Sequence, residues 1–324
     1  MLKIMVTGGA GFIGYHCELS LLKSNNKIIC LDNLNDYYSP DLKNKRLDLL
    51  KKDDNFIFEY VDIRNKTEVL QIVKKYKPDI VIHLAAQAGV RFSFHNPDIY
   101  ISTNIVGFFN VLDCCRETGL KNIIFTSSSS VYGNNTNKYF NESDPTDHPE
   151  SIYAATKKAD EEIAFAMAKN YGLNIVGLRL FTVYGPFGRP DMAYYSFADA
   201  IRTKSKIQVF NYGNVYRDYT YVEDVAYAIK KIIEKLTNSF LPFNFEIINI
   251  AHGKEYSVNQ MINYLEEEFK TSIEKEYVEK KIGDVDRTQA NTQKLYSLIG
   301  VKPKTDLQTG IKRFSKWYKD FYGL

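Results

Sequence analysis

Residues 3–14 read KIMVTGGAGFIG, an apolar run that leads directly into a group of glycines. The apolar run, residues 3–7, predicts a strand, and residues 12–23 predict a helix. Glycines permit a tight turn between the two, and they let the backbone approach a pyrophosphate that the N–H groups at the helix start would hold. Three glycines have the spacing of dinucleotide-binding turns: Gly8, Gly11 and Gly14. This stretch predicts the first strand, turn and helix of a dinucleotide-binding fold.

Strand-like apolar runs alternate with longer helical patterns through the first half of the chain. The expected strands are residues 27–32, 56–62, 80–85, 122–127 and 175–180, and the expected helices are residues 67–76, 97–118 and 151–171. This alternation implies right-handed β–α–β units and a parallel sheet that is covered by helices on both faces.

The alternation ends after residue 180, where prolines, glycines and tyrosines mark an irregular stretch. Beyond it we expect helices at residues 197–203, 257–269 and 307–321 and a strand at 207–210. The sequence therefore predicts an α/β fold, a Rossmann-type doubly wound parallel sheet with a smaller, mostly C-terminal substrate-binding α/β lobe. Residues 1–180 are assigned to the first domain, with about 216–251 returning to it, and residues 181–324 mainly to the second.

The composition is that of a globular protein and argues against several classes of function. The net charge of the 324 residues is only +3 and no dense Lys/Arg stripe is present, which argues against a nucleic-acid partner. No apolar run approaches the roughly 20 residues that a membrane span needs, and the first residues lack a secretory pattern. The four cysteines lack metal-ligand spacing: Cys17, Cys30, Cys114 and Cys115. We expect a cytoplasmic protein with reduced cysteines, no membrane partner and no metal.

An acidic residue, Asp32, ends the second predicted strand about 20 residues after the glycines. A carboxylate there accepts hydrogen bonds from the adenosine ribose and repels a 2′-phosphate, so we expect NAD rather than NADP. Asp62 ends the third strand, and small residues after His83 would let the cofactor lie across the sheet; His83 itself is interpreted as a core histidine. The predicted NAD contacts are Gly8, Gly11, Phe12, Ile13, Gly14, Asp32, Asn33, Asp62, Ile63, Leu84, Ala85, Ala86, Gln87, Ser127, Tyr153, Lys157 and Phe181.

Tyr153 and Lys157 are spaced to share one face of a helix. An ammonium one turn away favours the phenolate form of a tyrosine, which can then take a hydroxyl proton as a general base. The same spacing recurs elsewhere in the chain, but Tyr153 has an upstream partner in TSSSSVYG, residues 126–133, at the carboxyl end of the fifth strand. Ser128 or Ser130 is expected to bridge the substrate hydroxyl to Tyr153.

With these residues, the chain resembles the extended short-chain dehydrogenase/reductases that act on nucleotide sugars. The resemblance covers essentially the whole chain and rests on TGGAGFIG from Thr7, HLAA from His83, SSSSVYG from Ser127 and YAATK from Tyr153. Within this group it is most similar to UDP-glucuronate 4-epimerases, through DNLNDYY from Asp32, AAQAGVRFS from Ala85, FTVYGPFGRPDMA from Phe181 and RDYTYVEDV from Arg217.

The resemblance implies a reaction on a UDP-sugar with NAD as cofactor. Tyr153 would remove the C4 hydroxyl proton while C4 gives up a hydride, and the resulting 4-keto sugar would turn over and take the hydride back on its other face. Arg217 would meet the diphosphate, Gln208 and Phe210 would lie by the uracil, and Lys281 or Arg287 would supply a second cation. Arginine suits a diphosphate because its fork makes paired, charge-assisted hydrogen bonds.

The sugar is indicated by Thr182, which stands where glucose/galactose epimerases of this family usually have Asn. Together with serines 128–130 it would form a neutral, donor-rich wall suited to a carboxylate, with Arg91 and Arg189 as charged partners. The small Thr288 is near a size-limiting position, which leaves N-acetyl sugars open. The predicted substrate contacts are Val90, Arg91, Ser129, Thr182, Arg189, Met192, Gln208, Phe210, Arg217, Lys281, Arg287 and Thr288.

Other activities stay open beside the conversion of UDP-glucuronate to UDP-galacturonate. UDP-glucose or UDP-N-acetylglucosamine 4-epimerases are the first alternatives. A UDP-glucuronate decarboxylase is another, because a 4-keto uronic acid loses carbon dioxide when its carboxylate stands perpendicular to the ketone. A 4,6-dehydratase would carry Asp-Glu in place of Ser129-Ser130, and a non-catalytic NAD-binding regulator would not need Tyr153 and Lys157.

The resemblance also implies a homodimer. In such a dimer the two long predicted helices of each chain, residues 97–118 and 151–171, would pack against their copies in a four-helix bundle. A role in supplying precursors for surface polysaccharide biosynthesis is a hypothesis that follows from the activity class alone.

Overall fold

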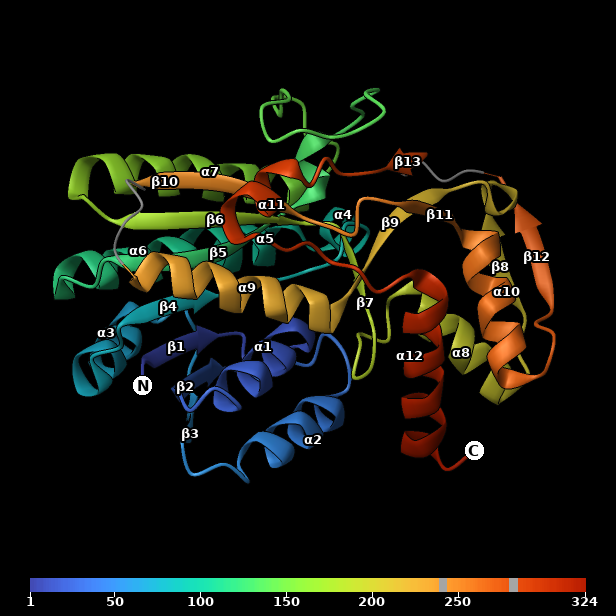
Figure 1. Ribbon diagram of the computed structural model, residues 1–324, viewed down its shortest axis with the longest axis horizontal. Helices are drawn as coiled ribbons and strands as arrows, with labels where there is room; N and C mark the ends of the chain where they lie inside the picture. Colours follow the sequence, from blue (N-terminus) through green and yellow to red (C-terminus); the bar gives the residue numbers. More distant parts are fainter. Residues whose placement is uncertain (239–243, 280–284) are drawn as a thin grey trace.

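In the described residues, 1–238, 244–279 and 285–324, the computed structural model centres on a sheet of seven parallel strands (Figure 1). The order across the sheet is β10-β6-β5-β4-β1-β2-β3. The strands are β1 (Lys3–Thr7), β2 (Lys27–Asp32), β3 (Phe56–Tyr60), β4 (Ile80–His83), β5 (Asn122–Ser128), β6 (Asn174–Leu180) and β10 (Phe245–Ile250). The chain proceeds outward from β1 to β3 and then returns to β4 on the other side of β1. Ligands of doubly wound sheets bind at the carboxyl edge beside this reversal.

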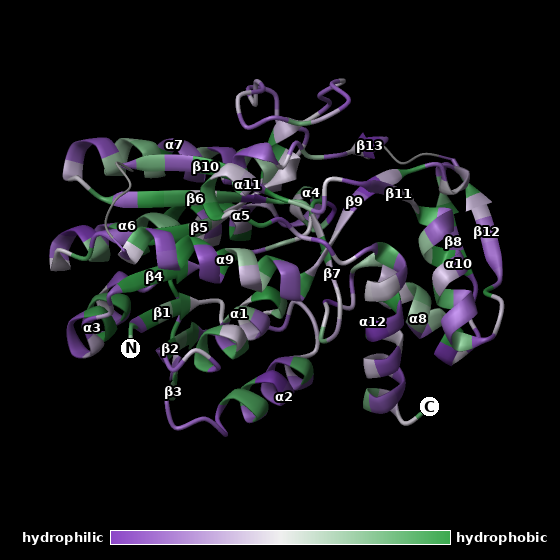
Figure 2. Ribbon diagram, in the orientation of Figure 1, coloured by the Kyte–Doolittle hydropathy of each residue, from purple (hydrophilic) through white to green (hydrophobic). Residues whose placement is uncertain are grey.

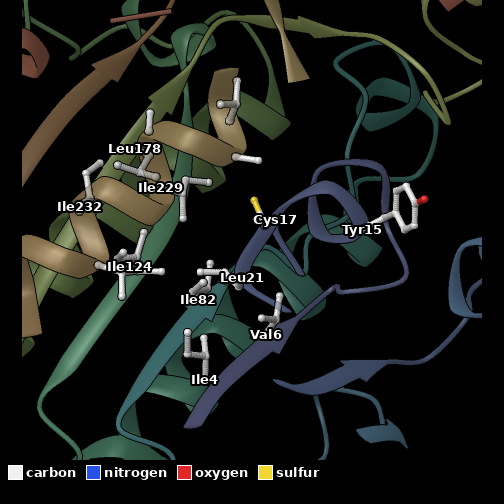
Figure 3. Packing of buried hydrophobic residues seen from close by; sticks show 14 of the residues in the cluster. Ile4, Val6, Tyr15, Cys17, Leu21, Ile82, Ile124, Leu178, Ile229 and Ile232 are labelled. Atoms are coloured by element: carbon white, nitrogen blue, oxygen red, sulfur yellow. The ribbon is translucent and has the colours of Figure 1, made fainter. Parts of the chain in front are cut away.

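Helices cover both faces of the sheet. One face carries α1 (Phe12–Leu22), α2 (Pro40–Leu50), α9 (Val222–Thr237) and α11 (Gln293–Ile299), and the other carries α3 (Lys66–Tyr76), α6 (Phe108–Thr118) and α7 (Ile152–Tyr171). The central strands are correspondingly apolar (Figure 2). Figure 3 shows the core beneath α1 and α9, where Leu21 and Ile229 lie over Ile82 and Ile124. This packing fixes where the N-terminal end of α1 meets the sheet edge.

The segment predicted as one helix over 97–118 has a different geometry in its middle. It consists of α5 (Pro97–Tyr100), a π-helical turn η1 (Ile101–Gly107) and α6, preceded by the short α4 (Phe92–His95). Asn104 in the π turn is buried, and its side chain bonds the backbone N–H and C=O of Gln87, with N–O distances of 2.7 and 3.1 Å. The wide turn thus brings an amide to the loop after β4, and π turns of this kind often occur at functional sites.

The second lobe is built from short strands and three helices. β9 (Tyr216–Tyr221) pairs with β7 (Thr182–Tyr184), β11 (Glu255–Ser257) and β13 (Arg287–Thr288), and β8 (Ile207–Phe210) pairs with β12 (Lys275–Val278). The helices α8 (Ala193–Thr203), α10 (Val258–Phe269) and α12 (Leu307–Tyr322) enclose an aromatic core with these strands. Buried members of that core include Tyr184, Tyr194, Tyr221, Phe314 and Tyr318.

The predicted α/β class and the doubly wound parallel sheet are confirmed. The structure adds elements that the sequence patterns did not mark, among them α2, α9 and the strands β9 to β13. Within the segment 216–251, β9 lies in the small sheet, whereas α9 and β10 lie in the layers around the seven-stranded sheet. Among the described residues, no helix combines the length and apolar character needed to span a bilayer.

Candidate active site

A cavity of about 530 Å³ opens at the carboxyl edge of the large sheet and extends to the second lobe. Its walls come from the ends of β1, β2, β4, β5 and β6, from the start of α7, and from the segments around residues 182–192, 217 and 285–288. All of the predicted NAD contacts line it: Gly8, Gly11, Phe12, Ile13, Gly14, Asp32, Asn33, Asp62, Ile63, Leu84, Ala85, Ala86, Gln87, Ser127, Tyr153, Lys157 and Phe181. The chain therefore brings residues from seven separate segments into one cleft.

The glycine turn is shaped for an anion at the N-terminus of α1. Gly8 has a φ of +71°, and a Cβ there would lie 2.6 Å from the backbone nitrogen of Ala85. A Cβ on Gly14 would lie 2.4 Å from the carbonyl oxygen of Gly8. The helix has no side-chain cap and no acidic residue in its first turn, so its N–H groups and positive dipole end stay available. This arrangement fits the pyrophosphate of the NAD expected from the sequence.

Acidic groups border the cleft where an adenosine ribose would be expected. Asp32 is buried, accepts a hydrogen bond from the Leu34 N–H at 2.8 Å, and lies 3.8 Å from the Lys43 ammonium. Burial raises the pKa of Asp32, and Lys43 opposes that rise. Burial would also raise the pKa of Asp62, but hydrogen bonds from Arg64 and Asn33 outweigh it and lower that pKa to about 2. Both carboxylates are held in place as hydrogen-bond acceptors.

Tyr153 and Lys157 project from the first turns of α7, which Ser151 begins by accepting a hydrogen bond from the Ala154 N–H at 3.1 Å. The Lys157 ammonium is buried and donates to the Thr126 carbonyl at 2.9 Å and to the Asp160 carboxylate at 3.1 Å. The Tyr153 ring contacts the ring of Tyr100, with centroids 6.2 Å apart. A tyrosine hydroxyl and a lysine ammonium are therefore both present at the sheet edge of the cleft.

The serines after β5 make two separate sets of hydrogen bonds. Ser128 and Ser130 share a hydrogen bond between their hydroxyls at 3.1 Å, and Ser128 also accepts from the Ser130 N–H at 3.1 Å. Ser127 donates to Glu161 at 2.6 Å, and Glu161 forms a buried bidentate pair with Arg179. Ser127 thus anchors the strand end through Glu161, and all four serines, 127–130, line the cavity.

His83 lies beneath this site rather than in it. It is buried, its Nδ1 lies 2.9 Å from the hydroxyl of Thr7, and its Nε2 has no hydrogen-bond partner among the described residues. Burial, reinforced by the charge of Lys157, lowers the pKa of His83 to about 3. The imidazole is therefore neutral at neutral pH and supplies no charge to the site.

Most predicted substrate contacts also line the cavity: Val90, Ser129, Thr182, Arg189, Met192, Arg217 and Thr288. Arg189 is held by Asp191 through two hydrogen bonds of 3.0 and 2.5 Å. Tyr37, on the loop after β2, donates to the same carboxylate at 3.1 Å. This contact joins the loop after β2 to the segment after β7 beside the cavity.

Four other predicted substrate residues in the described part of the chain do not line the cavity: Arg91, Gln208, Phe210 and Arg287. Arg91 lies over the ring of Phe210, 5.2 Å from its centroid, and Gln208 donates to Glu276 at 3.4 Å. Arg287 is paired with Glu255 on β11 and is directed along the small sheet. Lys281 lies outside the described residues. Arg287 therefore does not supply the second cation that was predicted to bind the diphosphate in the cleft.

Several cavity residues were not among the predicted contacts, including Tyr37, Lys43, Gly89 and Val285. Tyr37 and Gly89 fall inside the segments DNLNDYY and AAQAGVRFS, so the resemblance already pointed to them. A Cβ on Gly89 would lie 2.4 Å from the Tyr37 hydroxyl, which shows why a residue without a side chain is needed there. Lys43 is on α2, a helix that the sequence patterns did not mark.

Comparisons with known proteins agree with this geometry. The sequence model of the NAD dependent epimerase/dehydratase family matches residues 4–251, and the chain belongs to that family. UDP-glucuronate 4-epimerase 4 of Arabidopsis thaliana is 42% identical over 99% of this chain and 76% of its own length. The UDP-glucuronic acid 4-epimerase of Bacillus cereus, solved in complex with UDP-glucuronic acid and NAD, superposes with a TM-score of 0.91, at 31% identity over 99% of this chain and 100% of that chain.

A neutral-sugar enzyme has nearly the same fold. The UDP-glucose 4-epimerase of Thermotoga maritima, solved with UDP-glucose, has a TM-score of 0.88 and 30% identity over 99% of this chain and 100% of that chain. The overall fold therefore does not determine the specificity for the sugar, which depends on the residues of the cleft.

Replacing Asp32 with Ala tests the ribose contact. The variant should lose a charged acceptor for the ribose and leave Lys43 unbalanced next to the position of a 2′-phosphate. We expect NAD binding to weaken roughly tenfold relative to NADP, the scale of one hydrogen bond to a charged group. Calorimetric titration of the ligand-free protein with both cofactors measures this ratio. Asp36→Ala removes an exposed acid from the same loop and should leave the ratio unchanged; an unchanged ratio for Asp32→Ala would refute its assigned role.

Proposed function

We propose that the protein is an NAD-dependent 4-epimerase that interconverts UDP-glucuronate and UDP-galacturonate. The observation that carries this proposal is the composition of one cavity wall, where Thr182 and the serines 128–130 lie in the same cleft as Tyr153. This wall offers neutral hydroxyl groups to a C6 carboxylate. Relatives named UDP-glucuronate 4-epimerase, at about 40% identity over nearly the whole chain, support the same activity.

The cleft residues divide the reaction between holding the nucleotide and moving a proton. Arg217 is proposed to bind the diphosphate, and the glycine turn with Asp32 binds the cofactor. NAD, when bound, supplies the group that accepts hydrogen from C4 and returns it to the opposite face. Tyr153 Oη takes the C4 hydroxyl proton, directly or through Ser128 or Ser130, and gives it back after the sugar has turned over. Lys157 favours the phenolate form of Tyr153 through its positive charge.

The hydroxyl groups of Thr182 and serines 128–130 also argue against decarboxylation of UDP-glucuronate as the reaction. A 4-keto uronic acid keeps its carboxylate if neutral donors hold that group away from the perpendicular orientation. Hydroxyl donors from Thr182 and the serines can bind a carboxylate in this way, and Arg189 is already occupied by Asp191. We therefore favour epimerisation over loss of carbon dioxide. Epimerisation of UDP-glucose or UDP-N-acetylglucosamine is the second candidate, because the Thermotoga enzyme shares the fold.

We further propose that the protein acts as a homodimer in the cytoplasm, supplying nucleotide sugars for polysaccharide biosynthesis. Exposed apolar side chains on the segment 101–109 and on α7 support the dimer: Ile101, Val106, Phe109, Ile152 and Phe165. An apolar surface across neighbouring helices is typical of a helix-bundle interface. Four free, buried cysteines support a reducing compartment.

Product analysis tests the activity. Purified protein incubated with UDP-glucuronate should form UDP-galacturonate without release of carbon dioxide, as followed by chromatography and proton NMR. Tyr153→Phe should keep its bound NAD and lose at least about 100-fold in kcat, because the general base is gone. A pentose product would contradict the epimerase assignment, and conversion of UDP-glucose but not UDP-glucuronate would overturn the role of Thr182.

The dimer is tested by a charge placed on the exposed apolar surface. Phe109→Glu should convert the dimer to a monomer in sedimentation velocity, since an unpaired charge would be buried between the two copies. Tyr60→Glu, at the exposed end of the outer strand β3, is the matched control and should remain dimeric. A wild-type protein that sediments as a monomer at micromolar concentration would contradict the proposed dimer.

A further inference from the structure

The lysine assigned to the proton transfer has a second buried partner that the mechanism above does not use. Asp160, one helical turn after Lys157 on α7, is fully buried, and its Oδ2 accepts a hydrogen bond from the lysine at 3.1 Å. Its other oxygen, Oδ1, has no hydrogen-bond partner among the described residues. Asp160 does not line the cavity, so it reaches the reaction only through Lys157.

Lys157 is the cation that contacts the Asp160 carboxylate, and the neighbouring ionisable groups are paired or neutral. Glu161, the next residue on α7, is neutralised by Arg179 of β6 through two hydrogen bonds of 2.8 and 2.9 Å. His83 of β4, which faces Lys157 from below, is neutral at neutral pH. Tyr153 lies one turn before Lys157 on α7, and Tyr100 and Arg189 interact with it from other segments. Lys157 thus stands between two acids of the same helix, Tyr153 and Asp160.

A buried carboxylate with one unbonded oxygen is costly, and it does not stabilise the fold better than an apolar residue would. We propose that Asp160 is a positioning residue that holds Lys157 and offsets its charge, and so sets the pH above which Tyr153 acts as a base. The inference rests on the proposed function, because it concerns the proton transfer of the epimerase reaction.

The direction of the effect follows from the charges. When Asp160 is ionised, it cancels part of the positive charge of Lys157, and the phenolate of Tyr153 forms at a higher pH. When Asp160 takes a proton, Lys157 acts on Tyr153 with its full charge. Burial raises the pKa of Asp160 to about 7, and the charge and hydrogen bond of Lys157 oppose the rise. If Asp160 acts on the proton transfer in this way, the acid limb of the wild-type pH profile should be broader than one ionisation.

Asp160→Asn tests the proposal because the amide oxygen can keep the hydrogen bond to Lys157 while the charge is lost. The acid limb of kcat should move to lower pH by about half a unit to one unit, the scale of one nearby charge, and should narrow to a single ionisation. The KM for UDP-glucuronate should not change. Glu162→Gln is the matched control: it also removes one acid from α7, but Glu162 is exposed and paired with Lys158 at 2.8 Å. Its profile should overlay that of the wild type.

A second measurement separates this inference from the activity itself. In NAD-loaded protein labelled with ¹³C at the tyrosine ring Cζ, the Tyr153 signal is identified by its loss in Tyr153→Phe. Its titration midpoint should fall in Asp160→Asn without any substrate present. Asp160→Ala, which needs no buried partner, repeats the test if the Asn variant does not fold. A midpoint and an acid limb that match the wild type would overturn the proposal, whereas a shifted midpoint without turnover would count against the proposed activity only.

Discussion

The structure depends on the close approach of two backbones, the glycine turn before α1 and the segment after β4. A side chain at Gly8 would strike the Ala85 backbone, and one at Gly14 would strike the turn itself. Because no side chain stands between them, the start of α1 lies directly at the carboxyl edge where β1 and β4 diverge. The N–H groups of the helix, the acids after β2 and β3, and the serines after β5 then meet in one cleft.

A second constraint is the way charge is buried next to that cleft. The Glu161–Arg179 pair is complete within itself, and His83 is neutral, so neither disturbs the proton transfer. Lys157 is different, because its ammonium contacts a strand carbonyl and an aspartate at once. Lys157 therefore links the cleft to a buried acid, whereas in the proposed reaction Thr182 and the serines after β5 bind the sugar carboxylate.

More of the predicted cofactor contacts than of the predicted substrate contacts line the cavity. The glycines belong to one turn, and Tyr153 and Lys157 belong to one helix, so their spacing is fixed locally. Asp32 ends the strand that follows the first helix and pairs with β1, so its approach to the glycines could also be predicted. Arg287 and Gln208 lie on two- to four-residue strands, and their directions depend on pairing with β9, β11 and β12, which no periodicity reveals. The contact between Tyr37 and Asp191 joins residues 154 positions apart, and the π turn at 101–107 has no helical signature of its own.

In the proposed reaction C4 is oxidised and then reduced within one site, and isotope retention tests this directly. UDP-glucuronate carrying deuterium at C4 is converted in ordinary water, and the UDP-galacturonate is examined by proton NMR and mass spectrometry. The product should keep its deuterium at C4, because the hydrogen leaves and returns without contact with solvent. A product with solvent hydrogen at C4 would contradict it, since that outcome requires removal of C4 hydrogen as a proton by a base.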